Sequence, residues 1–302
     1  MPNSLANNLP ISGERPLGFE IVLSLFTSKK LLILIPILKI FFGAIIFEIL
    51  SVMEVIFFNY IYIYIFNFYK LAKKLMNNNT KRIIAIGGGG FTHKSDPILD
   101  KFVINQCQKK QIKFGFLPTA SEDNKEKINL FYNELQQYEI ELSHFELCSS
   151  VKGFERWLMS QDIIYIGGGN TKYMIKIWED NNFINTFKDA YDSGIILSGI
   201  SAGAVCWFDW ILSDSAGPGY NPLRGINILQ GSCTPHSSVP ERMSQYQSDI
   251  KDNKLPPGIA IDDGVAVLFI NGSAKEVCSA RDGCDAYFVD KNKKISLNKY
   301  IK

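Results

Sequence analysis

The sequence from residue 76 to residue 302 predicts an α/β fold, a mostly parallel sheet with helices on both faces. Two observations carry this prediction. Short apolar runs alternate with segments of helical length, as expected for buried parallel strands joined by helices. Glycine clusters directly follow several of these runs, where tight turns after strands would lie.

The predicted strands follow one another in chain order. They are RIIAI at 82–86, KFGFLP at 113–118, ELSHFEL at 141–147, DIIYI at 162–166 and GIILSGI at 194–200. After Cys233 the apolar runs become shorter, which predicts strands at a sheet edge and terminal hairpins.

Residues 1–75 form a hydrophobic N-terminal extension to this domain of residues 76–302. Residues 31–69 are dominated by Leu, Ile, Phe and Tyr, but Glu48 and Glu54 interrupt them, and each would cost ~2–3 kcal/mol at mid-membrane. Two interpretations stay open. The stretch is a membrane anchor that leaves the domain in the cytoplasm, or it is an upstream extension that no function requires because the true start is Met76.

Charge and cysteine content exclude several classes of function. The net charge of +2 provides no basic field, so nucleic acid is not an expected partner. The six cysteines form no CxxC pairs, which favours reduced thiols in a cytosol-like compartment. None of the three histidines stands at metal-ligand spacing with a cysteine, so we expect no metal. The oligomeric state cannot be predicted from these features.

The stretch GIILSGISAGAVCWF, residues 194–208, contains the clearest chemical signal. Ser201 stands between Gly199 and Gly203 where an apolar strand meets a predicted helix, which is the context of a G-x-S-x-G nucleophile turn. Ala202 would then offer its N–H at a helix N-terminus to an oxyanion. The alternative is that Ser201 only caps the helix, but that leaves both glycines unexplained.

A serine nucleophile needs a base, and His236 is the best candidate. It lies in GSCTPHSSVPER, a loop-like stretch of the kind that carries catalytic groups. His144 alternates with apolar residues in a predicted strand, where a structural role is expected, and His93 follows a glycine run.

Three carboxylates compete to orient this histidine. Asp263 ends a strand-like run in IAIDDGVAV, Asp214 lies in the loop LSDSAGPG, and Asp262 is the weakest choice. Aspartates beside glycine are also common turn formers, so the pattern leaves the acid undecided.

Two further glycine clusters follow predicted strands. In IIYIGGGNT, Gly168 and Gly169 allow a second oxyanion donor, and Asn170 and Thr171 are candidates for substrate contact. In IAIGGGGFT a dinucleotide loop is a weak alternative, because Phe91 breaks the G-x-G-x-x-G spacing.

From about Lys81 onward, the chain resembles the serine peptidases related to peptidase E (aspartyl dipeptidase) and cyanophycinase. The resemblance rests on signatures in a fixed order: IAIGGGGF, FLPTAS, YIGGGNT, GISAGAV, the histidine loop and AIDDGVAV. It implies a fold like the class I glutamine amidotransferases, with serine where those enzymes carry the nucleophilic cysteine.

Site residues can be carried over from this resemblance by motif. Ser201 matches the nucleophile, His236 the base, and Gly168 or Gly169 with Ala202 the oxyanion region. For the acid, the resemblance implies two options, of which we favour Asp263 for orienting the histidine. Asp263 stands where the family has a glutamate, and Asp214 matches an aspartate that is also proposed for the relay.

The implied activity is hydrolysis of short peptides through an acyl-enzyme, without a metal or cofactor. Some relatives prefer an aspartyl residue before the scissile bond, and Arg242 is the nearest candidate cation for it, although a solvated loop arginine is an equal alternative. Two other functions stay open: a non-catalytic ligand or nucleotide binder that uses residues 87–90, and an amidase or esterase.

Overall fold

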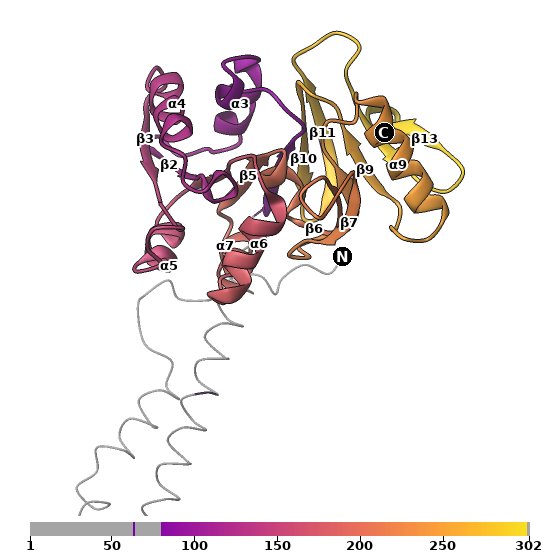
Figure 1. Cartoon of the computed structure of the whole chain (residues 1–302). Helices are drawn as coiled ribbons and strands as arrows, with labels where there is room; N and C mark the ends of the chain where they lie inside the picture. The colour runs from indigo at the N-terminus through magenta and orange to yellow at the C-terminus, as the bar shows by residue number, and fades with distance from the viewer. Residues whose placement is uncertain (1–62, 64–79, 301–302) are drawn as a thin grey trace, which may run out of the picture. The chain divides into compact units, whose positions relative to one another are not determined.

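The structure, a computed structural model, describes residue 63 and residues 80–300 (Figure 1). Apart from residue 63, the predicted membrane segment at 31–69 and the boundary after residue 75 lie outside these residues. Within the described part of the chain, no helix is both long enough and apolar enough to cross a bilayer.

A seven-stranded sheet organises residues 80–300, and the predicted α/β class is confirmed. From edge to edge its strands are β11 (Ser273–Ser279), β10 (Val265–Ile270), β1 (Arg82–Ile86), β5 (Ile196–Ile200), β4 (Ile163–Ile166), β2 (Ile112–Leu117) and β3 (Ile140–His144). The strands from β1 to β3 in this order are parallel, whereas β10 and β11 are antiparallel additions at one edge. The five strands predicted between residues 82 and 200 are therefore the parallel strands. The hairpin of β10 and β11, later in the chain, forms one edge of the sheet.

Both faces of this sheet are buried, because alternate strand residues point into two separate cores. On one face, Ile84 and Ile86 of β1 pack in a cluster with residues of α3 (Pro97–Asn105) and α4 (Lys125–Leu135). On the other face, Ile83 packs in a cluster with residues of three further helices. These are α5 (Phe154–Met159), α6 (Thr171–Asp180) and α7 (Ile184–Asp192).

A second, six-stranded sheet was not predicted from the sequence. Its order is β13 (Lys294–Ser296), β12 (Ala286–Val289), β9 (Gly258–Ile261), β8 (Leu229–Thr234), β6 (Phe208–Ser213) and β7 (Asn221–Arg224). Helix α9 (Pro240–Lys251) packs on it through Met243, Tyr246 and Ile250, and α10 (Leu297–Tyr300) ends the described chain.

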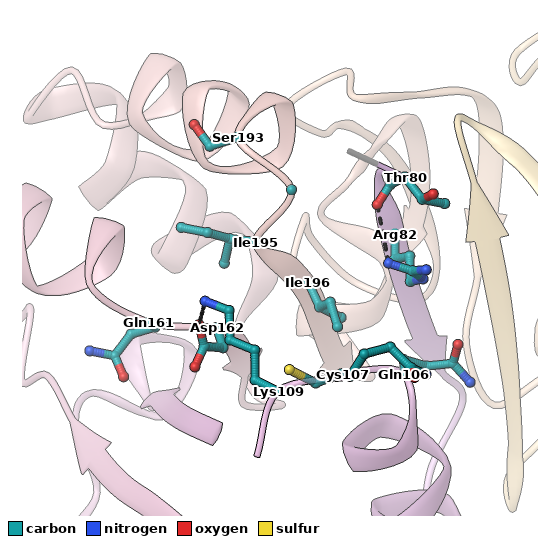
Figure 2. Close-up of a pocket in the computed structure, with 12 residues that line it drawn as sticks. Thr80, Arg82, Gln106, Cys107, Lys109, Gln161, Asp162, Ser193, Ile195 and Ile196 are labelled. Carbon is teal, nitrogen blue, oxygen red and sulfur yellow. Dashed lines mark hydrogen bonds and ion pairs between the residues drawn. The ribbon is translucent and has the colours of Figure 1, made fainter. Parts of the chain in front are cut away.

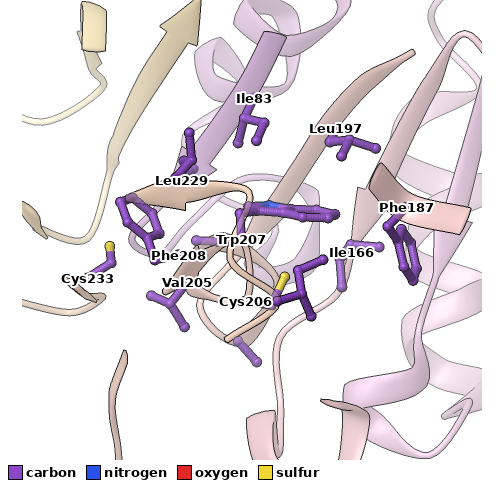
Figure 3. Packing of buried hydrophobic residues seen from close by; sticks show 14 of the residues in the cluster. Ile83, Ile166, Phe187, Leu197, Val205, Cys206, Trp207, Phe208, Leu229 and Cys233 are labelled. Carbon is purple, nitrogen blue, oxygen red and sulfur yellow. The ribbon is translucent and has the colours of Figure 1, made fainter. Parts of the chain in front are cut away.

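The helix expected after Ser201 is present but short. Helix α8 spans only Ala202–Val205, and the chain then enters β6. The reason is tertiary: the apolar residues after α8 fill the space between the two sheets instead of continuing the helix. Figure 3 shows Trp207 and Phe208 in this packing, and Trp207 lies 5.9 Å from Phe187 of α7, measured between ring centroids.

Trp207 is fully buried, so we predict that Trp207→Ala lowers the free energy of unfolding by about 3–5 kcal/mol, through lost burial and the cavity left behind. Urea denaturation measures the change. The control is Val151→Ala, because Val151 is 44% exposed and should change stability by less than about 0.5 kcal/mol. Equal effects of the two variants would contradict the packing described.

A carboxyl group is buried behind the glycine run of residues 87–90. Asp100 of α3 is 6% exposed, and its Oδ1 makes no hydrogen bond within residues 80–300. Burial raises the pKa of Asp100 to about 7, an effect partly offset by the Phe91 N–H that donates to it. The folded chain therefore keeps a proton between about pH 4 and pH 7 that the unfolded chain releases, so this group destabilises the fold increasingly as pH rises through that window.

We predict that Asp100→Asn raises the free energy of unfolding by roughly 2–4 kcal/mol at pH 8, because the amide needs no proton to be neutral. The gain should shrink as pH falls from 7 to 4. Urea denaturation across this range measures it, with Asp180→Asn on the exposed side of α6 as control. A gain that is independent of pH would contradict the assignment.

Candidate active site

Ser201 lies in a strained turn at the carboxyl end of β5. Its backbone has φ 54° and ψ −111°, a conformation that side chains rarely adopt and that is associated with functional sites. The flanking glycines allow this turn, because a Cβ on Gly199 would collide with the Gly203 carbonyl, and one on Gly203 would collide with the Ile166 carbonyl at the end of β4. The turn is therefore packed backbone against backbone, and neither glycine position has room for a side chain.

His236 lies directly beside this serine. The distance from Ser201 Oγ to His236 Nε2 is 2.9 Å, and that from His236 Nδ1 to Asp263 Oδ1 is 2.5 Å. Since a carboxylate only accepts, Nδ1 carries the ring proton and Nε2 is free to accept from the serine hydroxyl. The structure thus joins Ser201, His236 and Asp263 in one chain of hydrogen bonds.

The second sheet places the histidine and this aspartate together. Strands β8 and β9 are parallel neighbours, and His236 and Asp263 each follow the end of one of them by two residues. The histidine loop is also tied to the strand end, since Ser237 N–H donates to Ile261 O at 3.0 Å. Asp262, the weakest sequence candidate, accepts from Ser237 Oγ at 2.6 Å and so anchors the loop rather than contacting the imidazole.

The glycine run after β1 makes room for the same pair. A Cβ on Gly88 would collide with the Asp263 carboxylate and would lie 3.3 Å from His236 Nδ1. Gly264 N–H donates to Gly88 O at 2.8 Å, which holds the two loops together. This contact explains why glycines are needed after β1, which the spacing of the glycines in the sequence did not reveal.

Electrostatics favour the ionised form of Asp263. The hydrogen bond from His236 lowers the pKa of Asp263, burial opposes this, and the charges of His236 and Arg281 lower it further. Arg281 packs against Gly264 and pairs with Asp96, with an Nη2 to Oδ2 distance of 2.6 Å. No motif marks Arg281 in the sequence, because its proximity to Asp263 arises from the strand that follows β10 at the antiparallel edge of the first sheet.

Asp214, the other candidate acid, contacts Arg242 instead of the histidine. Arg242 Nη2 lies 2.8 Å from Asp214 Oδ2, and its Nη1 donates to Pro235 O at 3.2 Å. Arg242 belongs to helix α9 and is 3% exposed, so the alternative interpretation of Arg242 as a solvated loop residue is wrong. The Arg242–Asp214 pair thus lies beside Pro235, the residue that precedes His236.

The predicted oxyanion region lies beside Ser201. A Cβ on Gly168 would lie 3.2 Å from Ser201 Cβ, so the loop after β4 passes close to Ser201. Within residues 80–300 the N–H groups of Ala202, Gly168 and Gly169 donate to no acceptor, which leaves them available to a ligand.

The two polar residues after these glycines are used by the fold. Asn170 caps α6 by accepting from Tyr173 N at 2.9 Å, and Thr171, the first residue of α6, is buried. Their backbone still shapes the loop that contacts Ser201.

The remaining histidines lie apart from this hydrogen-bonded chain. His144 ends β3, and its Nδ1 lies 2.8 Å from the Tyr132 hydroxyl, as the expected structural role requires. His93 lies in a short 3-10 turn, with Nδ1 3.1 Å from Gly89 O.

A separate hollow of about 310 Å³ lies at the amino ends of the strands, the edge opposite the serine (Figure 2). Residues at the starts of β1, β4 and β5 line it, together with Lys109, which pairs with Asp162. The Ser201–His236 pair is not among its lining residues and lies at the carboxyl edge instead.

Comparison with known proteins identifies the family of this chain. Residues 83–277 match the model of peptidase family S51. An uncharacterized peptidase of Bacillus subtilis (strain 168), YgaJ, is 38% identical over 212 residues, which cover 69% of this chain and 92% of that protein. The crystal structure of a peptidase from an acI-B1 Actinobacterium has the same fold, with a TM-score of 0.54, 16% identity, and coverage of 72% of this chain and 97% of that one. The chain therefore belongs to peptidase family S51.

Proposed function

We propose that this protein is a serine peptidase that hydrolyses short peptides through an acyl-enzyme on Ser201. The observation that carries the proposal is the unbroken series of hydrogen bonds from Ser201 through His236 to Asp263. The protein that holds this series belongs to a peptidase family. A serine that only capped α8 would not need this arrangement, and its side chain in fact makes no cap hydrogen bond to the helix.

In the proposed mechanism, Ser201 Oγ attacks the peptide carbonyl carbon while His236 Nε2 takes the hydroxyl proton. The carbonyl oxygen becomes an oxyanion that accepts hydrogen bonds from Ala202 N–H and from the glycine loop. His236 then gives the proton to the leaving amine, the C–N bond breaks, and an ester on Ser201 remains. Water, deprotonated by His236, hydrolyses that ester and frees the serine.

The substrate proposal is a short peptide, the substrate class that the resemblance to peptidase E implies. Arg242 is a weak candidate for recognising an aspartyl side chain, since its guanidinium is buried and already paired with Asp214. An aspartyl preference, if measured, would have to use this arginine after release from Asp214 or a different cation.

We predict that Ser201→Ala lowers kcat/KM on the best dipeptide by about 10⁴-fold or more, because the acyl-enzyme cannot form. A dipeptide panel followed by steady-state kinetics measures the loss, and amide and ester substrates test the alternative hydrolases. Ser248→Ala, on the exposed side of α9, should leave turnover unchanged. Covalent labelling of wild type by a fluorophosphonate probe gives an independent readout, and unchanged turnover in Ser201→Ala would refute the proposal.

We further predict that Asp263→Asn lowers kcat by roughly 10³–10⁴-fold, because an amide at this position stabilises the wrong imidazole tautomer. Asp214→Asn is the matched comparison and should lower kcat by less than about tenfold, since it removes only a charge partner of Arg242. The reverse order of the two effects would assign the orienting acid to Asp214.

A further inference from the structure

A lysine that no motif marks reaches the loop beside the nucleophile. Lys127, in the first turn of α4, donates from Nζ to Gly168 O at 2.8 Å. The side chain is half-buried, and this burial lowers the pKa of its ammonium group. Within residues 80–300 no carboxylate pairs with it. Placing a partly desolvated charge on a carbonyl alone is costly, so the position calls for a functional reason.

The Gly168 carbonyl that accepts from Lys127 belongs to a peptide group whose other polar atom is an N–H. The Gly168 carbonyl and the Gly169 N–H share one peptide unit, and no cis peptide occurs in the described chain. In a planar trans peptide these two groups point in opposite directions. A bond that fixes the carbonyl therefore also fixes the direction of the Gly169 N–H. Glycines flank this unit, so no side chain would otherwise resist its rotation.

The sheet order shows which way each end faces. Strand β4 lies between β5 and β2, so its loop lies between Ser201, which follows β5, and α4, which follows β2. A Cβ on Gly168 would point toward Ser201, 3.2 Å from its Cβ, whereas the Gly168 carbonyl is bound by Lys127 of α4. The Gly169 N–H therefore points toward the side on which Ser201 lies.

The backbone on which Lys127 stands is itself held to this loop. Asn170 N–H donates to Ala120 O at 2.7 Å, which ties the segment before α4 to the segment before α6. Asn124 caps α4 by accepting from Lys127 N at 3.1 Å. The base of the lysine side chain is thus anchored relative to the peptide that it binds.

We propose that Lys127 is a positioning residue of the oxyanion site, where its ammonium group holds the Gly168 carbonyl away from the reacting centre and directs the Gly169 N–H toward it. This inference rests on the proposed peptidase mechanism. A cation on the carbonyl also polarises the peptide and strengthens its N–H as a donor. Without the lysine, the peptide is free to rotate, and its carbonyl oxygen would then repel the developing oxyanion.

The test compares full-length wild type, Lys127→Met, Lys127→Arg and Lys125→Met on the peptide that wild type cleaves best. Lys125 is the matched control because it lies on the same helix, is exposed and pairs with Glu146. We expect Lys127→Met to lower kcat by roughly 10–100-fold, as partial loss of an oxyanion donor would, while KM stays within about threefold. Lys127→Arg should recover most of kcat, and Lys125→Met should resemble wild type.

Several results would overturn the inference. One is an unchanged kcat in Lys127→Met. Another is a loss that appears as a raised KM and only for peptides with a free C-terminal or side-chain carboxylate, compared with their amides, because Lys127 would then bind substrate directly. Failure of Lys127→Arg to recover kcat while remaining folded would also count against it. Equal turnover by wild type and Ser201→Ala would instead refute the proposed peptidase function itself.

Discussion

The turn at Ser201 has no space for side chains at residues 199 and 203, and this constraint positions the rest of the site. Gly199 packs on the Gly203 backbone, which in turn packs on the end of β4. The serine is consequently held with a positive φ at the carboxyl edge of the sheet. Strain of this kind persists only where the surroundings determine the conformation fully, and here two parallel strands and a buried core do so.

The other parts of the site reach the same edge from separate strands. The loop after β4, from which we propose that backbone amides bind the oxyanion, passes close to Ser201, and the loop after β1 lacks side chains where the histidine and the aspartate lie. The second sheet contributes those two residues from adjacent parallel strands. Parallel strands with neighbouring carboxyl ends thus bring together residues that are 35 and 27 positions apart in the sequence.

Local patterns were sufficient to predict the parallel strands and to single out Ser201 and His236, whose side chains the structure places 2.9 Å apart, because each pattern depends on composition within a few residues. They could not decide between Asp214 and Asp263, since that choice depends on whether Arg242 or His236 lies next to each carboxylate. The second sheet was missed for a similar reason: Trp207 and Phe208 follow the serine as an apolar run, but Trp207 packs as a buried turn residue and Phe208 begins strand β6. Lys127 and Arg281 carry no motif at all, because their roles depend on contacts made across loops.

The central claim is that Ser201 is a nucleophile that faces an oxyanion site made of backbone amides. A crystal structure of the fluorophosphonate-treated protein tests it most directly. The account predicts phosphorus bonded to Ser201 Oγ, with its phosphoryl oxygen within hydrogen-bond distance of the Ala202 and Gly169 N–H groups. An unmodified Ser201, or an adduct whose phosphoryl oxygen points away from both amides, would contradict it.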